Sequence, residues 1–416
     1  MITHLNKITI ILLLLGFSSV LPAKLEKTVE SISVFGNHRA STAMIERVIP
    51  LKKGAAFSSD ELKRCKKVLE QLGIFSRVEI ETRESDGIII IINVKEKTLF
   101  YISPSVRFNA GSDDLYFQNE EAEKSAYGVG FGMNDFSGRR QSFKLSLAAG
   151  KLNRVGLSYG KEYSFGLSWG ASLANLWYTS AAFDGKVEKF RSRLFLGQRY
   201  SHLFLRLWGE YEHLKTKNNR LVLPGDFRNR YRYGLDLTYN SSRPVLFPFS
   251  GVRILAGVSQ VMSGGKDKLY DRYNFQLSSF INVFKRSVLA LDFRAILSDG
   301  YVPPDERVYF GGYRALRTSP IREYSGKQAV LFSCEYRVPL TGFSRHSSSS
   351  KMLGSTLYLF SDFGMIAEHA KELDLDNIKY NTGIGFIMAL NKESILRLDV
   401  GVFPKFRVVL STGWKF

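Results

Sequence analysis

Cysteine is almost absent from this sequence, in which Cys65 and Cys334 are the only two among 416 residues. Two cysteines cannot build the disulfide framework of a small secreted scaffold. Neither stands in a Cys-x-x-Cys pair or beside a histidine, as a zinc site would require. We therefore expect both to be buried or lipid-facing apolar residues, and we predict no metal or cofactor.

Long apolar runs are also scarce. The run Ile8–Phe17 is shorter than the about 18 apolar residues of a transmembrane helix, and no other run reaches that length, so a helical membrane protein is excluded. Lys7 precedes this run and small residues lie before Ala23, which is the pattern of a secretory signal peptide. Residues 1–23 are therefore predicted to be a signal peptide, and the chain is expected to leave the cytoplasm.

Acidic residues are outnumbered, with 39 Asp and Glu against 58 Lys and Arg and a formal charge of +19. The basic residues are scattered singly through a secreted chain, so nucleic acid is not an expected partner. We interpret the excess charge as a polar lumen together with attraction to anionic lipid headgroups. The sequence has no H-E-x-x-H motif, and its six histidines show no ligand spacing. A hydrolase is a remote alternative, and we predict that the protein is not an enzyme.

Residues 24–97 are predicted to form a small soluble α+β domain. VESISVFGNHRAS has the pattern of a strand and turn, and TAMIERVI that of a short helix. Apolar residues recur at helical spacing in SDELKRCKKVLEQLG. Two strands follow, separated by the turn Asp86-Gly87. The predicted element order is β-α-α-β-β.

This order resembles that of a polypeptide-transport-associated (POTRA) domain. Three family patterns are present: an apolar residue, Gly and Asn in the first strand, G-x-F-x-x-V after the second helix, and V-x-E at the end. The residues that match them are Val34, Gly36, Asn37, Gly73, Phe75, Val78, Val94 and Glu96. We expect them to form core and turns rather than to carry chemistry. The resemblance implies a single POTRA domain at residues 24–97.

From residue 98 to Phe416 the polarity alternates with a period of two residues. In SHLFLRLWGEYEHL, for example, Leu205 and Leu207 lie on the opposite side of the strand from Arg206 and Glu210. Such segments, separated by turn residues, predict about sixteen antiparallel strands. They are predicted to begin near residues 99, 123, 140, 154, 165, 186, 201, 227, 250, 268, 287, 325, 353, 380, 394 and 406.

The last strand distinguishes a membrane barrel from a soluble β-sandwich. A barrel in lipid carries apolar residues outside and charges within, which is the reverse of a sandwich. One face of FRVVLSTGWKF is apolar up to its terminal aromatic residue, and this face resembles the targeting signal of bacterial outer-membrane barrels. Its residues are Phe406, Val408, Leu410, Trp414 and Phe416. We therefore predict a membrane β-barrel at residues 98–416.

The segment GGYRALRTSP, residues 311–320, joins a glycine turn to two arginines. It resembles the sixth extracellular loop of the outer-membrane protein assembly superfamily, the BamA/TamA-like bacterial surface antigen barrels. Gly311, Gly312, Leu316 and Arg317 match the family pattern G-G-x-x-x-[VL]-R-G-[FY]. The next two residues, Thr and Ser, depart from that pattern.

Two later segments, SCEYRVPL and YLFSDFG, resemble the family's E-x-R-x-P-[LF] and F-x-D-x-G strands. The resemblance implies that Arg317 pairs with Glu335 and Asp362 and acts as a latch that holds the loop in the lumen. A guanidinium suits this role because its planar donor fork can hold two carboxylates at fixed geometry, which lysine cannot do.

The resemblance implies a bacterial outer-membrane barrel with its POTRA domain in the periplasm. Such a barrel inserts or translocates client polypeptides by strand exchange at a weak seam between its first and last strands. Implied partners are outer-membrane lipids, client outer-membrane or secreted polypeptides, and periplasmic chaperones or assembly partners. The alternatives are a two-partner secretion transporter for an unfolded adhesin, and a passive channel or anchor barrel.

Overall fold

The computed structural model describes residues 27–72, 74–97, 99–107, 125–134, 141–161, 166–180, 185–216, 225–243, 247–265, 267–284, 287–312, 314–320, 323–341, 354–389 and 395–412. The predicted signal peptide lies outside these residues, as do Gly73, Trp414 and Phe416. The chain divides into two compact units, Met1–Lys97 and Thr98–Phe416.

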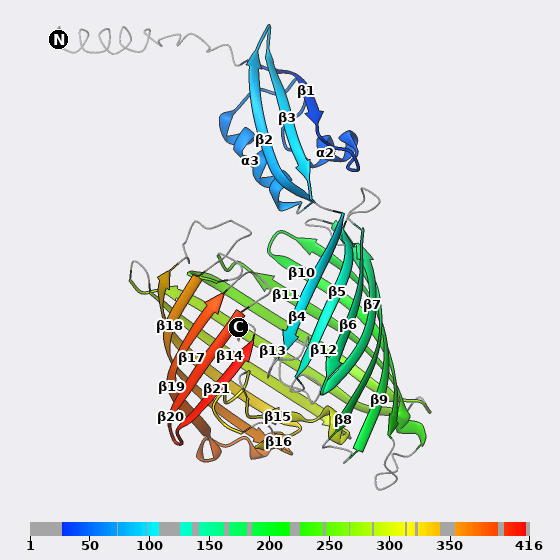
Figure 1. Ribbon diagram of the computed structural model, residues 1–416, viewed down its shortest axis with the longest axis vertical. Coiled ribbons are helices and arrows are strands. Elements are labelled where there is room, and N and C mark those ends of the chain that lie inside the picture. Colours follow the sequence, from blue (N-terminus) through cyan, green and yellow to red (C-terminus); the bar gives the residue numbers. More distant parts are fainter. Residues whose placement is uncertain are drawn as a thin grey trace, which may run out of the picture. The chain divides into compact units, whose positions relative to one another are not determined.

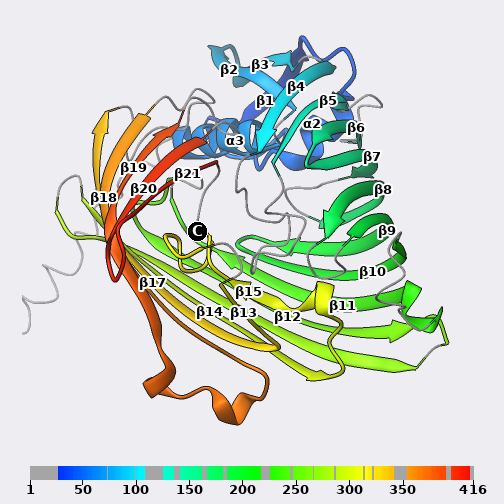
Figure 2. The same ribbon diagram turned by 60° about the horizontal axis from the view of Figure 1, so that its bottom comes forward.

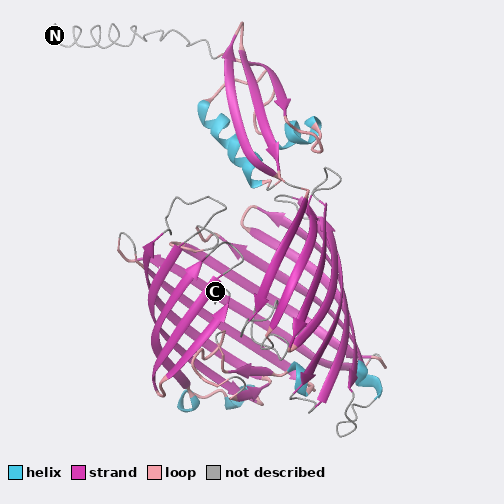
Figure 3. Cartoon of the chain, in the orientation of Figure 1, coloured by secondary structure: helices cyan, strands magenta, loops and turns pink. Residues whose placement is uncertain are grey.

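The N-terminal unit packs two helices against a three-stranded sheet (Figure 3). Its elements are β1 (Val29–Phe35), α2 (Thr42–Val48), α3 (Ser59–Gln71), β2 (Phe75–Glu84) and β3 (Ile88–Glu96). The sheet order is β1-β3-β2, with β1 parallel and β2 antiparallel to β3. The predicted order β-α-α-β-β is confirmed.

The core of this unit forms because α3 and β3 each present one apolar face. Cys65 and Leu69 on α3 are buried, as are Ile90 and Ile92 on β3, where buried residues alternate with half-buried ones. A helical period of 3.6 and a strand period of 2 thus meet in one hydrophobic cluster. Burial in this cluster raises the pKa of the Cys65 thiol.

Glu96 ties the end of β3 to the turn after β1. Its carboxylate accepts hydrogen bonds from the backbone N–H groups of Arg39 and Ala40, both at 2.9 Å, and from Arg39 Nε at 2.8 Å. Burial opposes ionisation of this carboxyl, but the backbone and guanidinium donors prevail and lower its pKa. Glu96, the last residue of the V-x-E pattern, therefore holds the end of β3 against the turn after β1.

The second unit is a curved sheet of sixteen antiparallel strands in the described part of the chain (Figure 1). In chain order the strands are β4 (Phe100–Arg107), β5 (Ala126–Asn134), β6 (Gln141–Gly150), β7 (Leu152–Lys161), β8 (Gly166–Ser180), β9 (Gly185–Tyr200), β10 (Leu203–Thr216), β11 (Asn229–Asn240), β12 (Gly251–Ser263), β13 (Lys268–Asn282), β14 (Val288–Gly300), β17 (Gln328–Thr341), β18 (Gly354–Ala367), β19 (Lys379–Ala389), β20 (Ile395–Phe403) and β21 (Arg407–Thr412). Each begins within three residues of its predicted start.

The connections carry the remaining short elements. They are the 3₁₀ turns η1 (Gly225–Arg228), η2 (Pro304–Glu306), η3 (Ala370–Glu372) and η4 (Leu375–Asn377), and the two-stranded ribbon of β15 (Val308–Phe310) and β16 (Tyr324–Gly326). The ribbon belongs to the long connection between β14 and β17. Figure 2 shows the segment with β15 within the ring of strands.

The barrel is apolar outside and charged inside. On β9 and β10, Leu194 and Leu207 are each 62% exposed, whereas Arg230 on β11 and Glu212 on β10 are fully buried. This is the reverse of a soluble protein and is typical of a barrel whose outer face meets hydrocarbon. The predicted membrane β-barrel is confirmed. Among the residues described, no helix has the length and apolar character needed to cross a membrane.

The two ends of the sheet come together. The pairing order runs from β21 to β4, and Cα atoms of these two strands lie within 8 Å of each other. The first and last strands therefore meet, as predicted, although no hydrogen-bonded ladder joins their described residues. We call this junction the seam.

Candidate functional site

The connection between β14 and β17 folds back on itself at two glycines. Gly311 and Gly312 have φ angles of +112° and +94°, in the left-handed region that residues with a Cβ rarely adopt. The N–H of Gly312 donates to the carbonyl of Ser319 at 3.3 Å, and the N–H of Ser319 donates to the carbonyl of Leu316 at 3.0 Å. The loop tip is therefore a closed turn that presents Arg317 at a fixed point.

Apolar packing holds this tip in place. Ala315 and Leu316 have no exposed surface, and they pack with Phe310 of the ribbon and with Ala329 and Leu331 on β17. A solvated loop would place small polar residues here. The tip is instead part of a hydrophobic cluster on the inner wall, which is the environment in which a buried ion pair is strongest.

Arg317 is fully buried and contacts carboxylates on two strands. Its Nε and Nη2 donate to the two oxygens of Asp362 on β18, at 2.8 and 2.7 Å, and Nη1 donates to Glu335 Oε1 on β17 at 2.6 Å. The guanidinium carbon lies 4.2 Å from the ring centroid of Phe360. The structure thus brings together the three residues that the sequence grouped, with a two-pronged contact of the guanidinium on Asp362.

Further charges complete this group. Glu335 also pairs with Arg337 at 2.6 Å and with Arg397 at 3.3 Å, and Asp399 lies 3.5 Å from Arg397 and 3.8 Å from Arg317. We call Arg317, Arg337, Arg397, Glu335, Asp362 and Asp399 the tip cluster. Its three positive and three negative charges balance, which is the condition under which buried charges are tolerated.

Sequence reasoning missed two members of the tip cluster and one neighbour. Arg397 and Asp399 lie on the polar face of β20, and the hydroxyl of Tyr358 on β18 hydrogen-bonds to both of them. Period-two alternation in ILRLDVGVF marks Arg397 and Asp399 as lumen-facing. The alternation could have identified both as candidate lumen residues, but it could not have shown that they lie beside Arg317.

The departure from the family pattern at Thr318 has a local explanation. Thr318 is 6% exposed and lies over Gly401 on β20, where an added Cβ would stand 2.5 Å from Thr318 Oγ1. The loop carries a side chain where the pattern has glycine, and the facing strand carries glycine. Contact between the loop and the wall is preserved by this exchange.

Two family models match the chain. Residues 27–97 match POTRA, described as a surface antigen variable number repeat, and residues 105–406 match the Omp85 superfamily domain. The second match spans 406 − 104 = 302 of 416 residues. The chain belongs to the Omp85 superfamily. The resemblance of the sequence to this family, with a POTRA domain before the barrel, is confirmed.

Solved structures share the fold of this Omp85 chain. The crystal structure of BamA from Haemophilus ducreyi lacking POTRA domains 1-3 has a TM-score of 0.65 and 18% identity, covering 93% of this chain and 85% of that chain. CdiB from Acinetobacter baumannii has a TM-score of 0.57 at 13% identity, with 93% and 73% covered. CdiB from Escherichia coli has a TM-score of 0.58 at 12% identity, with 92% and 75% covered. No curated protein sequence matches the chain as a relative.

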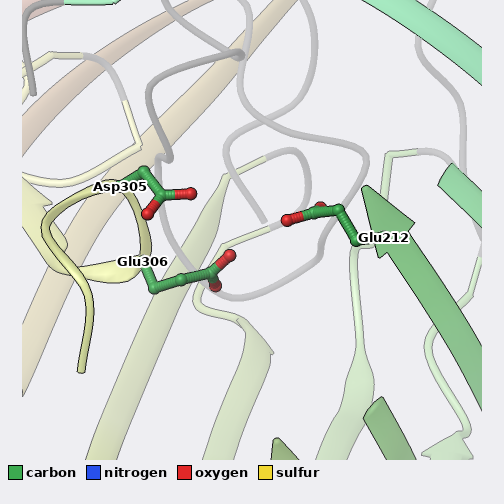
Figure 4. Close-up of side chains that lie close together, drawn as sticks. All are labelled: Glu212, Asp305 and Glu306. Carbon is green, nitrogen blue, oxygen red and sulfur yellow. The ribbon is translucent and has the colours of Figure 1, made fainter. Parts of the chain in front are cut away.

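The Omp85 barrel also contains a group of three carboxylates, Glu212, Asp305 and Glu306, whose oxygens lie within 4.8 Å of one another (Figure 4). Carboxylate oxygens are ligands for hard cations. However, Nη1 of Arg230 lies 2.7 Å from Asp305, 3.2 Å from Glu306 and 3.5 Å from Glu212. One guanidinium already pairs with all three, so we interpret the group as an ion-pair network rather than a metal site.

One segment of the Omp85 barrel has the spacing of a hydrolase motif. Residues 166–170, GLSWG, match G-x-S-x-G, in which the serine of a hydrolase sits on a sharp turn between strand and helix. Here the segment lies at the start of β8, and Ser168 is a buried residue of that strand. The match is therefore a strand of small and apolar residues without the geometry of a nucleophile elbow.

The last described strand of the Omp85 barrel presents the predicted apolar face outward. Phe406, Val408 and Leu410 are 76%, 53% and 48% exposed, whereas Val409 between two of them is buried. The predicted targeting face continues through Trp414 and Phe416, which lie outside the described residues. Its role as a targeting signal stays a prediction.

Proposed function

We propose that this Omp85 chain is a bacterial outer-membrane barrel that inserts or translocates client polypeptides through the seam between β4 and β21. The observation that carries the proposal is the state of this junction among the described residues. Strands β4 and β21 are the two ends of the pairing order and have Cα atoms within 8 Å of each other, but no hydrogen-bonded ladder joins their described residues.

A junction without a ladder is weak because its two strands lack the backbone hydrogen bonds that join the other neighbouring strands of the sheet. Pro104, which pairs with Val129 inside β4, has no N–H and further reduces the donors of that strand. In hydrocarbon an unpaired backbone group costs several kcal/mol, so an opened seam favours pairing with any strand that can supply partners. A client strand can supply them by β-augmentation.

The tip cluster supports the same function from inside the barrel. Arg317 joins the loop to β17 and β18, and Asp399 and Arg397 extend the network to β20, the neighbour of β21. We propose that Arg317, Glu335 and Asp362 act as the latch of this loop. The latch keeps the wall beside the seam in one shape while the seam itself opens and closes.

The proposal places the barrel in the outer membrane and the POTRA domain in the periplasm. Its partners are outer-membrane lipids, client polypeptides and periplasmic assembly partners. The POTRA sheet has an edge strand, β2, that can pair with an extended client segment. The protein acts on its clients by pairing and positioning, without covalent chemistry.

The test is to lock the seam. Cysteine pairs that combine Ser103 or Ser105 on β4 with Val409 or Ser411 on β21 are introduced after the native cysteines are replaced by alanine. The full chain is reconstituted in vesicles and incubated with an unfolded eight-stranded outer-membrane barrel as the client. We expect oxidation to abolish membrane insertion of the client, and reduction to restore it.

The matched control is a cysteine pair at Leu207 and Leu235, which face each other across β10 and β11 far from the seam. Oxidation of this pair should leave client insertion unchanged. Insertion at the same rate through a locked seam would contradict the proposal. A secreted adhesin fragment that crosses the membrane whole would favour the two-partner secretion alternative instead.

A further inference from the structure

The loop that carries Arg317 contacts the barrel wall at a second place. Its entering limb forms η2, where Asp305 and Glu306 point towards strands other than those of the tip cluster. Arg230 on β11 donates through Nη1 and Nη2 to the two oxygens of Asp305, at 2.7 and 2.9 Å. Arg230 Nε also donates to the carbonyl of Phe227, at 3.2 Å, which fixes the direction of the fork.

Glu306 is held by three other wall residues. Arg232 on β11 donates to Glu306 Oε1. Tyr270 on β13 donates its hydroxyl to Oε2 at 3.1 Å. Arg272, also on β13, donates to the backbone carbonyl of Glu306 at 2.7 Å. The wall therefore binds both the main chain and the side chain of Glu306, which fixes the position of the limb.

The part of this contact around Arg230 and Asp305 is as dry as the tip, whereas the side chains of Arg232 and Glu306 are 13% and 9% exposed. Arg230 is fully buried, and the side chains of Lys189, Glu212 and Asp305 are 3%, 0% and 1% exposed. Lys189 on β9 lies 3.6 Å from both Asp305 and Glu212, so it supplies a second cation to the same group. Buried charges at this density hold a defined geometry because separating any one of them leaves another unpaired.

We propose that Asp305 and Glu306, with Arg230 and Arg232, form a second anchor of the loop that acts independently of Arg317. The polarity of the two anchors is reversed. At the tip the loop supplies the guanidinium and the wall supplies the carboxylates, whereas at the limb the loop supplies the carboxylates and the wall supplies the guanidinium groups.

The two anchors lie on different sectors of the barrel. The limb contacts strands β9 to β13, whereas the tip contacts β14, β17, β18 and β20, which are the next strands in the pairing order. The loop therefore forms a chord between two parts of the wall. Releasing Arg317 alone frees the tip but leaves the limb in the lumen, so both anchors must open before the loop can leave.

The test measures each anchor with its own reporter. Single cysteines replace Val302, which is 2% exposed and packs with Val261, Leu269 and Tyr270 beside the limb, or Thr318, which is 6% exposed at the tip. The native cysteines are replaced by alanine, and the full barrel in detergent is labelled with a bulky maleimide. Labelling rates report how often each site becomes exposed, independently of any client.

We expect Asp305→Asn combined with Glu306→Gln to accelerate labelling at position 302 by about tenfold or more, which corresponds to about 1.4 kcal/mol or more of lost docking. Labelling at position 318 should change less than about twofold, under about 0.4 kcal/mol. Arg317→Ala should give the opposite pattern. If both reporters accelerate together in either variant, the loop docks as one unit and the second anchor is refuted.

The matched control is Arg206→Met, which breaks the pair of Arg206 with Asp236 on the same two strands, β10 and β11. This variant should leave the labelling rate low at both reporter positions. Equal labelling at position 302 in this control and in the limb variant would also overturn the proposal. Arg230→Asp alone should accelerate labelling, and the charge exchange that combines it with Asp305→Arg should make labelling slow again. Recovery in the double variant shows that the single variant released the limb rather than misfolded the barrel.

Discussion

Replacing Arg317 by alanine tests the docked loop most directly. The change removes three side-chain hydrogen bonds to carboxylates, at 2.6, 2.7 and 2.8 Å, together with the contact on Phe360. It also changes the charge balance of the tip cluster from three against three to two arginines against three carboxylates. The surplus negative charge has no exposed surface through which water could stabilise it, since Glu335 and Asp362 are fully buried.

The expected cost follows from these contacts. Removing one partner of a buried ion pair costs roughly 3–5 kcal/mol, because the remaining charge is left unpaired. At about 1.4 kcal/mol per factor of ten, the fraction of molecules with an undocked tip should rise by roughly 10² to 10³ or more. The wall around the tip is stabilised by its own ladder, so the barrel should still fold.

The assay compares protease cleavage of the loop and the temperature at which the folded band is lost on gels. Arg317→Lys should be intermediate, since lysine keeps the charge but cannot reach Asp362 with a two-pronged contact. Arg314→Ala should have a small effect, because the carbonyl of Arg314 that accepts from Arg294 at 3.1 Å survives the change. If Arg314→Ala proves the more damaging variant, or if Arg317→Ala resists protease like the wild type, Arg317 does not hold the loop.

Three further outcomes are expected. The mature protein should migrate faster on gels when unboiled, because a closed barrel resists detergent, and identical migration would count against closure. Deleting Phe416 should reduce membrane insertion but not export across the inner membrane, as measured by cell fractionation; normal outer-membrane levels would remove the targeting role. Glu96→Gln should destabilise the POTRA domain by about 1 kcal/mol at neutral pH, measured by hydrogen exchange of residues 27–97. Because folding lowers the pKa of Glu96, its contribution to the stability of the domain is full above the unfolded pKa of about 4.3 and is lost as the pH falls through the folded value. The stability of the Glu96→Gln variant should therefore depend less on acid pH than that of the wild type. An unchanged dependence would contradict this assignment.

The strands could be predicted from sequence because a two-residue period is a local property. The alternation of Leu205, Arg206 and Leu207 alone shows which of them face outward and which faces inward. The loop residues were identified through the family pattern, in which glycines and an arginine stand at fixed spacing. Nothing in GGYRALRTSP by itself distinguishes a buried arginine from a solvated one, and the role of Arg317 as a latch stays a prediction.

The remaining partners could not be predicted because they depend on how the strands are staggered around the barrel. Arg230 and Asp305 are 75 positions apart in the chain, and their contact is set by the tilt of β11 and by the path of the loop above it. Asp399 meets Arg317 for the same reason. Alternation shows that such residues face inward, whereas depth along the barrel axis decides which of them meet.

The packing of Thr318 over Gly401 has a consequence for engineered chimaeras. A loop transplanted from a protein that has glycine at this position would bring no side chain to cover Gly401, and a small void would open where the two surfaces now touch. Conversely, a larger residue at position 401 would collide with the native loop, since even a Cβ would come within 2.5 Å of it. The loop and strand β20 should therefore be exchanged together. A graft that carries both keeps the contact between Thr318 and Gly401, which a graft of either one alone would lose.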